Sequence, residues 1–301
     1  MISCSLLIPC YNAEKYLPRL WETVEAQTVP FDEVICYDDG SQDNTVEVAK
    51  SLGAKVIVGN KNIGVSHARN QLAKASNCDW IHFHDADDIL HPEYLEKTKA
   101  KIDSSIDVII CNADWVDEET RQLVIARKYQ NQDFKNNPLI AAIANPIGVI
   151  SGLYRKDKFL MVKGFNENYS CWEDADLHVC LAGSGAKFLV VEEVLAFSLR
   201  HSHGLSQNQH KCWHCRFQFL KKYANEFDSS INEVVIEQLE VVTRAFLGLN
   251  DKELAFESLK FCQFLGGNPP KTQNILLQSL KSIMPAFWLI QIQDFIRRQS
   301  L

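Results

Sequence analysis

The chain has 301 residues and a formal net charge of −7, and hydrophobic residues make up 46% of it. This composition supplies enough apolar surface for a folded core and excludes an intrinsically disordered chain. The acidic balance argues against a protein that binds nucleic acid by neutralising its phosphates. The length predicts two domains of modest size.

Strand-like and helix-like patterns alternate through the first third of the chain. The predicted strands are Ser5–Ile8, Glu33–Tyr37, Lys55–Val58, Trp80–His84 and Val108–Ala113. The predicted helices between them are Glu14–Gln27, Gln42–Leu52, Gly64–Ala75 and Pro92–Lys101. This alternation predicts an α/β fold with a doubly wound, mostly parallel sheet. In such sheets the ligand crevice lies beyond the carboxyl ends of the strands.

The remainder of the chain has a different pattern. Val116–Leu205 is less regular, and after His210 the apolar spacing becomes helical. The predicted helices there are Cys212–Tyr223, Ile231–Leu247, Lys252–Leu265 and Thr272–Arg298, the last broken near Pro285. We therefore expect a catalytic domain over residues 1–208 and an α-helical C-terminal region over residues 209–301.

Ten cysteines are scattered along the chain, which is long enough to fold without disulfides. The first eight residues lack the basic start of a signal peptide, and no apolar run reaches the roughly 18 residues of a membrane span. These features predict a cytoplasmic location. Trp288 and Ile292 lie at helical spacing near the C-terminus, which predicts a helix with one apolar face. This helix could either pack on the protein or contact a membrane surface.

Polar side chains follow several predicted strands at the point where each strand ends. The segments are Pro9-Cys10-Tyr11-Asn12, Asp38-Asp39-Gly40-Ser41 and Asp85-Ala86-Asp87-Asp88. Carboxylates at successive strand ends converge on one crevice, and clustered anions persist where a cation or a donor-rich ligand satisfies them. The plainer interpretation is that these aspartates cap helices and shape turns.

Three chemistries could explain Asp85 and Asp87. An EF-hand loop fails, because it would need a glycine where Leu90 stands and an oxygen ligand where Ile89 stands. A haloacid-dehalogenase-like phosphotransferase places its aspartate pair after the first strand, whereas this strand is the fourth. The third possibility is a pair that holds Mg²⁺ or Mn²⁺ against a diphosphate, for which one or two carboxylates suffice.

The ordered segments resemble the motifs of family 2 glycosyltransferases of the GT-A fold. The resemblance covers roughly residues 1–206. It rests on Leu7-Ile8-Pro9-Cys10-Tyr11-Asn12, Asp38-Asp39-Gly40-Ser41-Gln42-Asp43-Asn44-Thr45, Asn62-Ile63-Gly64-Val65-Ser66-His67-Ala68-Arg69-Asn70 and Asp85-Ala86-Asp87-Asp88. It implies an inverting transfer of a sugar from a nucleotide-diphosphate donor, by default a UDP-sugar, to a hydroxyl of a glycan or lipid-linked saccharide acceptor.

The resemblance also implies roles for the donor-binding residues. Pro9 and Tyr11 would shape the pocket for the nucleobase, and Asp38 or Asp39 would accept a hydrogen bond from the base imide or from a ribose hydroxyl. Arg69 would face the base or the phosphates as a permanently charged donor.

The metal and the chemistry are assigned in the same way. Asp85 would reach the ribose or donor sugar, and Asp87 would ligate Mn²⁺ or Mg²⁺. His201, whose spacing to Ser206 fits better than that of the alternative His203, would complete the metal or diphosphate site. Asp174 would be the general base and Glu173 would contact acceptor or donor. Two acidic residues at a helix start also match the helix dipole, which is the structural alternative for this pair.

Two other functions stay open from the sequence. One is the haloacid-dehalogenase-like phosphotransferase, and the other is a sugar-nucleotide-binding protein without catalysis. A zinc site at Cys212 and Cys215 is disfavoured, because no second ligand pair follows at zinc-site spacing.

Overall fold

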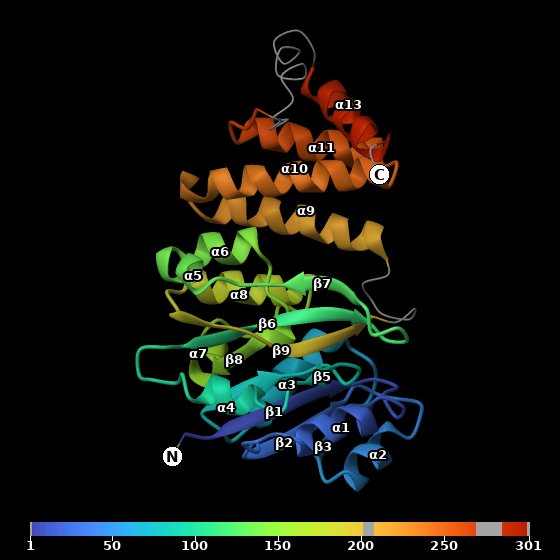
Figure 1. Cartoon of the computed structure of the whole chain (residues 1–301), viewed down its shortest axis with the longest axis vertical. Helices are drawn as coiled ribbons and strands as arrows, with labels where there is room; N and C mark the ends of the chain where they lie inside the picture. The colour runs from blue at the N-terminus through green and yellow to red at the C-terminus, as the bar shows by residue number, and fades with distance from the viewer. Residues whose placement is uncertain (1, 201–207, 269–284, 300–301) are drawn as a thin grey trace. The chain divides into compact units, whose positions relative to one another are not determined.

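Figure 1 shows the computed structural model of the chain, which describes residues 2–200, 208–268 and 285–299. The chain divides into two compact units, Met1–Gly204 and Leu205–Leu301. This division lies near the expected boundary between residues 208 and 209. That the two units are separate domains stays a prediction.

The described part of the first unit contains one nine-stranded sheet. Its strands follow the order β3-β2-β1-β4-β8-β6-β9-β5, and β7 pairs with β6 off this path. The strands are β1 (Cys4–Cys10), β2 (Glu33–Asp38), β3 (Lys55–Val58), β4 (Trp80–Phe83), β5 (Ile89–Leu90), β6 (Val108–Asp117), β7 (Leu123–Arg127), β8 (Gly152–Arg155) and β9 (Phe188–Arg200).

Helices of this unit connect the strands and cover the sheet (Figure 1). They are α1 (Leu17–Glu25), α2 (Thr45–Ser51), α3 (Val65–Ala75), α4 (Tyr94–Lys99), α5 (Asn131–Asn136), α6 (Pro138–Ala144), α7 (Lys156–Met161) and α8 (Glu173–Gly183), with a 3-10 turn, η1 (Val149–Ser151).

The N-terminal half of the sheet is parallel, as the alternating pattern predicts. Strand β1 pairs in parallel with both β2 and β4, and every one of its residues is buried. Burial on both faces explains its unbroken apolar run. Cys10 is the register partner of Asp38, so the ends of β1 and β2 meet at the same edge. The predicted α/β class and mostly parallel sheet are confirmed.

The middle of the chain is more regular than its sequence suggests. Strand β6 continues to Asp117, beyond the expected end at Ala113, and β8 lies antiparallel between β4 and β6. Strand β9 pairs in parallel with β6, but its register shifts between Val191 and Val194. The two intervening residues, Glu192 and Glu193, are exposed. This irregularity breaks the alternation by which a strand is recognised.

The second unit is helical in the part that the structure describes, as expected. Its elements are α9 (Gln209–Glu226), η3 (Ser229–Ile231), α10 (Asn232–Gly248), α11 (Lys252–Phe264) and α13 (Ala286–Gln299). Phe217, Val242, Phe246 and Leu259 are buried on α9, α10 and α11. In the described ranges, His, Cys, Asp and Glu residues form no cluster of three that could bind zinc.

Within the same ranges, none of the helices combines the length and apolar character that crossing a bilayer requires.

Candidate active site

The loop after β2 is held to the loop before α3 by Asp39. Its carboxylate accepts hydrogen bonds from the backbone N–H groups of Ile63 at 3.1 Å and Gly64 at 2.7 Å. Gly40 has a φ of +77°, and a Cβ there would lie 2.7 Å from the backbone of Lys61. The Asp-Gly pair therefore lets two loops approach closely at the edge where the sequence predicts the nucleotide. Asp39 contributes to this site by fixing backbone.

Asp38 lies at the end of β2 and is 3% exposed. One of its oxygens accepts a hydrogen bond from the Ser41 N–H at 3.2 Å. The other oxygen, Oδ1, is buried and finds no hydrogen-bond partner among the described residues. A buried acceptor without a partner is costly unless a ligand supplies a donor. Of the adjacent aspartates, Asp38 has an oxygen with no partner, which could accept from an N–H or O–H of a ligand, whereas both oxygens of Asp39 already accept from backbone N–H groups. Pro9 is buried within β1 nearby, and Tyr11 is 47% exposed.

Arg69 is buried on α3 and joins two separate acidic motifs. Its Nη2 donates to Asp85 at 2.6 Å and its Nη1 donates to Glu173 at 2.9 Å. Burial disfavours the charged guanidinium, but the two carboxylates outweigh it and raise the pKa of Arg69 above its usual value. Arg69 thus bridges a strand end to the start of α8. Its expected role at the base or phosphates of a donor stays a prediction.

Asn70, the next residue on α3, fixes the segment that leads into α8. Its amide accepts from the Phe165 N–H at 2.9 Å and donates to the Phe165 carbonyl at 2.9 Å. It also donates to Glu167 at 3.0 Å. Arg69 and Asn70 together hold a segment about 100 residues away against α3.

Glu173 and Asp174 begin α8, directly after a residue with unusual backbone geometry. Trp172 has a φ of +75°, a left-handed conformation that bulky residues rarely adopt and that is found mostly where surrounding structure enforces it. Asp174 is half-buried. Burial and the charge of Glu173 raise the pKa of Asp174 to about 7. A carboxyl group in this range suits proton transfer near neutral pH.

A buried histidine, His178, contacts the backbone of Asp174. His178 Nδ1 lies 2.6 Å from the backbone carbonyl oxygen of Asp174, and its Nε2 lies 3.0 Å from the Tyr154 hydroxyl. A carbonyl only accepts, so we infer that Nδ1 carries the hydrogen and that Nε2 accepts from Tyr154. Burial lowers the pKa of His178 to about 4, which keeps this ring neutral. The first turn of α8 is therefore anchored independently of Arg69.

The Asp85–Asp88 segment follows β4 and is tied to β9. Asp88 is 5% exposed and accepts a hydrogen bond from the Leu199 N–H at 2.8 Å, and the Ser198 side chain also bonds to it. Burial and the charges of Asp87 and Asp85 raise the pKa of Asp88. Asp88 thus anchors β9 and is not available to a ligand.

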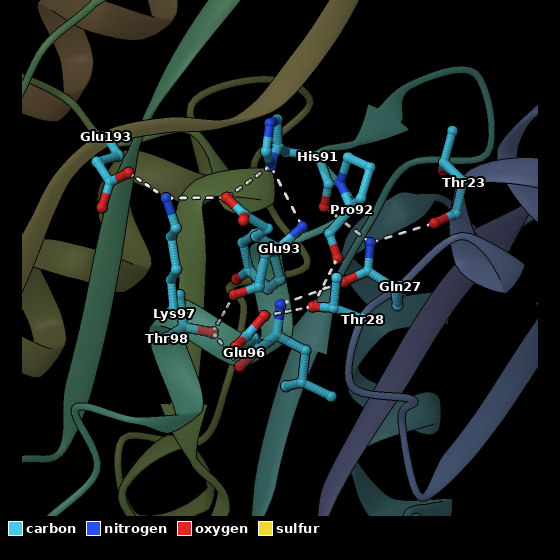
Figure 2. A network of polar contacts seen from close by, with 12 residues as sticks. Thr23, Gln27, Thr28, His91, Pro92, Glu93, Glu96, Lys97, Thr98 and Glu193 are labelled. Carbon is cyan, nitrogen blue, oxygen red and sulfur yellow. Dashed lines mark hydrogen bonds and ion pairs between the residues drawn. The ribbon is translucent and has the colours of Figure 1, made fainter.

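Three polar side chains in and just beyond α1 form hydrogen bonds with the backbone between Asp87 and His91. Arg19 Nη2 donates to the Asp87 carbonyl at 2.8 Å, and Thr23 Oγ1 accepts from the Leu90 N–H at 3.3 Å. Gln27 donates to the His91 carbonyl at 2.8 Å, as Figure 2 shows. The three residues recur every four positions, so one side of this segment fixes the backbone from Asp87 to His91.

The same region is stapled further by contacts to α4. Thr28 Oγ1 donates to Glu96 at 2.6 Å, and Lys97 pairs with both Glu93 and Glu193 (Figure 2). These contacts are exposed and each contributes little to stability. Together they tie α4 to Thr28 and to β9.

The residues at this edge fit a divalent cation in chemistry. Asp87 is half-buried, and Asp85 retains 31% exposure of its side chain. Mg²⁺ and Mn²⁺ at diphosphate sites need only one or two protein carboxylates. His201, the third expected participant, lies outside the described residues. The described ranges contain no group of three side chains that would hold a metal without substrate.

Sequence reasoning missed the supporting residues around the site. Arg19, Thr23 and Gln27 carry a visible four-residue spacing, and His178 lies one turn after Asp174. Those spacings were the available signals. The bond from Leu199 to Asp88 spans 111 positions and has no local signature.

A sequence profile described as glycosyl transferase family 2 matches residues 5–159 of the chain. The matched range contains the three strand-end motifs and Arg69. The chain belongs to glycosyl transferase family 2. Among curated relatives, EpsH of Bacillus subtilis strain 168 is 32% identical over 136 residues, which are 42% of this chain and 39% of EpsH. The match thus spans well under two thirds of that family 2 relative.

Two solved structures share the fold of this family 2 chain. TarS 1-349 of S. aureus, in complex with UDP-GlcNAc, aligns with a TM-score of 0.67 and 18% identity over 97% of this chain and 88% of that one. The mannosyltransferase PcManGT from Pyrobaculum calidifontis, in complex with GDP-Man and Mn²⁺, aligns with a TM-score of 0.62 and 14% identity. The alignment covers 97% of this chain and 86% of PcManGT. These likenesses establish the GT-A fold that the sequence motifs implied.

Proposed function

We propose that this chain transfers a sugar from a nucleotide-diphosphate donor to a hydroxyl group of a saccharide or lipid-linked acceptor, with inversion at the anomeric carbon. The observation that carries the proposal is the bridge from Arg69 to both Asp85 and Glu173. It joins the acidic strand end, where a donor diphosphate would lie, to the start of α8, where Asp174 has a raised pKa.

The donor side of the proposal rests on the edge formed by β1 and β2. The unpaired Oδ1 of Asp38 would accept a hydrogen bond from the base or ribose, beside Pro9 and the exposed Tyr11. Asp39 and Gly40 hold the surrounding loops. The TarS complex contains UDP-GlcNAc and the PcManGT complex contains GDP-Man, and we take a UDP-sugar as the default donor.

Asp174 is the proposed general base. Its carboxylate would accept the proton of the acceptor hydroxyl as that oxygen bonds to the anomeric carbon and the bond to the diphosphate breaks. Inversion requires attack from the face opposite the leaving group. Glu173, which accepts a hydrogen bond from Arg69, would contact acceptor or donor. Its negative charge also helps to raise the pKa of Asp174.

Asp87, with Asp85 beside it and His201 as the expected third participant, would hold Mn²⁺ or Mg²⁺. Such a cation would supply positive charge to the departing diphosphate. The chain's own contribution is to fix the Asp87 backbone, through the hydrogen bond from Arg19.

The test is hydrolysis of nucleotide sugars by the purified chain with Mn²⁺. We expect release of nucleoside diphosphate from one donor of a panel, and loss of that release in Asp87→Ala. A donor at a hundredfold excess over its dissociation constant should stabilise the protein by about 2.7 kcal/mol. Detection of a covalent aspartyl phosphate would contradict the proposal and favour a haloacid-dehalogenase-like phosphotransferase. Donor binding without turnover would favour a non-catalytic protein.

A further inference from the structure

Two arginines flank one tryptophan at the end of the β7–β6–β9 part of the sheet. Trp115 lies on β6, Arg127 on the neighbouring β7 and Arg200 at the end of β9. The guanidinium carbon of Arg127 is 4.7 Å from the indole centroid, and that of Arg200 is 4.9 Å from it. The two cations therefore reach the same ring from the strands on either side of β6.

This pair is not neutralised by carboxylates of the described part of the chain. Neither Arg127 nor Arg200 forms an ion pair within residues 2–200. Of the acidic residues on this part of β6 and the turn after it, Glu118 binds Arg19 at 2.7 Å and Asp117 accepts from the Thr120 N–H at 2.8 Å. Asp114 has a buried Oδ1 without a hydrogen-bond partner among the described residues. Each cation–π contact is individually weak at an exposed site. Two like charges on one ring repel, and an anion between them would relieve that repulsion.

The strand register places this pair on the same face as the acidic site. Trp115 is the register partner of Ser198, and side chains of paired residues share a face. Arg200 follows Ser198 by two positions and so points to that face as well. The Ser198 side chain bonds to Asp88 of the metal motif. The arginines thus share the sheet face of Ser198, which bonds to Asp88, yet they come from strands other than β1 and β2, where we place the nucleotide.

We propose that Arg127, Trp115 and Arg200 form an acceptor subsite for an anionic group, a phosphate or carboxylate borne by the saccharide that is glycosylated. The inference rests on the proposed transferase function. Guanidinium groups present paired N–H donors that match both anions in a bidentate manner. The indole holds the two groups in place before the ligand arrives.

The surface beside the pair suits the carbon skeleton of such an acceptor. Ile125 is the register partner of Trp115 and is 37% exposed, and Leu123 on the same strand is 59% exposed. Exposed apolar side chains next to two charged groups provide a surface on which a sugar ring can pack. The combination fits a saccharide that carries a charge better than a neutral one.

The subsite is tested by calorimetric binding of three probes to the full chain with UDP and Mn²⁺ at saturation. The probes are a neutral glucose tetrasaccharide, a tetrasaccharide with two glucuronates and a glycerol-phosphate trimer. We expect at least one anionic probe to bind ten-fold or more tightly than the neutral probe, and the comparison of the two identifies carboxylate or phosphate. Equal affinity for all three probes, or no binding of either anionic probe, would overturn the proposal.

Charge variants localise the effect. The double variant Arg127→Gln with Arg200→Gln should lose the ten-fold preference, while Arg127→Lys with Arg200→Lys should keep part of it. Arg121→Gln, an exposed arginine of the same hairpin, is the matched control and should keep all of it. Equal loss in the control, or weaker UDP binding in the double glutamine variant, would reject the acceptor subsite.

The outcome is separable from the proposed transferase function. Intact donor hydrolysis with no discrimination among probes rejects only the subsite. Discrimination among probes without donor hydrolysis supports the subsite and rejects only the transferase.

Discussion

The guanidinium of Arg69 donates a 2.9 Å hydrogen bond to Glu173, which lies 104 positions further along the chain. The same guanidinium holds Asp85 at 2.6 Å. One buried side chain therefore links the acidic strand end to the helix that carries Asp174, in addition to the anchor that His178 gives to the first turn of that helix.

Replacing Arg69 with methionine should destabilise the fold strongly. Removing one partner of a buried pair leaves uncompensated charges, at a cost of about 3–5 kcal/mol. Arg69→Lys should also fail to restore activity, because one ammonium group cannot bridge two carboxylates as a guanidinium does. Urea unfolding followed by circular dichroism measures the change. Lys55→Met, which breaks the exposed pair with Glu33, should cost under about 1 kcal/mol. Similar losses in the two methionine variants would show that Arg69 is not the bridge we describe.

Asp174→Asn should reduce sugar transfer by about 10²–10⁴-fold, because asparagine cannot take the acceptor proton. Donor affinity should change little, since Asp174 is assigned to the acceptor side. Turnover and the dissociation constant for the donor, measured separately, distinguish these effects. Asp157→Asn, at an exposed aspartate, serves as the control and should retain full activity. Retention of turnover in Asp174→Asn would remove this residue from the chemistry.

The pH dependence of kcat/KM should report the raised pKa of Asp174. The base acts only when ionised, so activity should fall about tenfold per pH unit below about 7 and level off above it. A rate profile between pH 5 and 8.5 on saturating Mn²⁺ measures this. A profile that is flat across this range would be incompatible with Asp174 as the base.

The raised pKa of Asp174 makes the folded state less stable as the pH rises. This is the reverse of the effect of a carboxyl group whose pKa is lowered by folding. Between the ordinary aspartate pKa of about 4 and the folded value of about 7, the folded state binds more protons than the unfolded state. The free energy of unfolding should therefore fall as pH rises through this window. Asp174→Asn removes that dependence, so the variant should gain thermal stability over the parent at pH 8 and not at pH 4. Equal differences in Tm at the two pH values would contradict the shift.

Arg19→Gln tests whether α1 positions Asp87, the residue that we propose holds the metal. The substitution removes the bond to the Asp87 carbonyl and the ion pair with Glu118. Outer contacts of this kind typically affect metal affinity or activity by about 10–100-fold. The concentration of Mn²⁺ at half-maximal donor hydrolysis should rise by about tenfold, with little change in Tm because Arg19 is partly exposed. Arg155→Gln, which removes a cation far along the chain from this motif, should leave the Mn²⁺ requirement unchanged. An unaltered Mn²⁺ requirement in Arg19→Gln would mean that the hydrogen bond from Arg19 to the Asp87 carbonyl has no role in catalysis.

Much of the fold was predictable because its signals are local. The alternation from Ser5 to Ala113 indicates the parallel sheet, and short apolar strands that end in Asp-Asp-Gly or Asp-x-Asp mark the edge of the crevice. The helices of the second unit follow from apolar spacing in the same way.

The rest depended on contacts between distant segments. Strand β9 carries two exposed glutamates at its register shift, so its pattern does not alternate. The role of Arg69 could not be read from α3, because its second partner, Glu173, comes from α8. Our inference that Asp38 rather than Asp39 would accept a hydrogen bond from a ligand depends on which oxygens backbone amides already occupy.

Asp174 is proposed to act as base at a nucleotide-sugar site built on Asp85 and Asp87. The most direct measurement is the rate of nucleoside diphosphate release from the preferred nucleotide sugar, with Mn²⁺, for the parent chain, Asp87→Ala and Asp174→Asn. We expect release by the parent, its loss in Asp87→Ala, and a loss of at least about 10²-fold in Asp174→Asn with donor affinity preserved. Release that is equal in all three proteins would contradict this proposal.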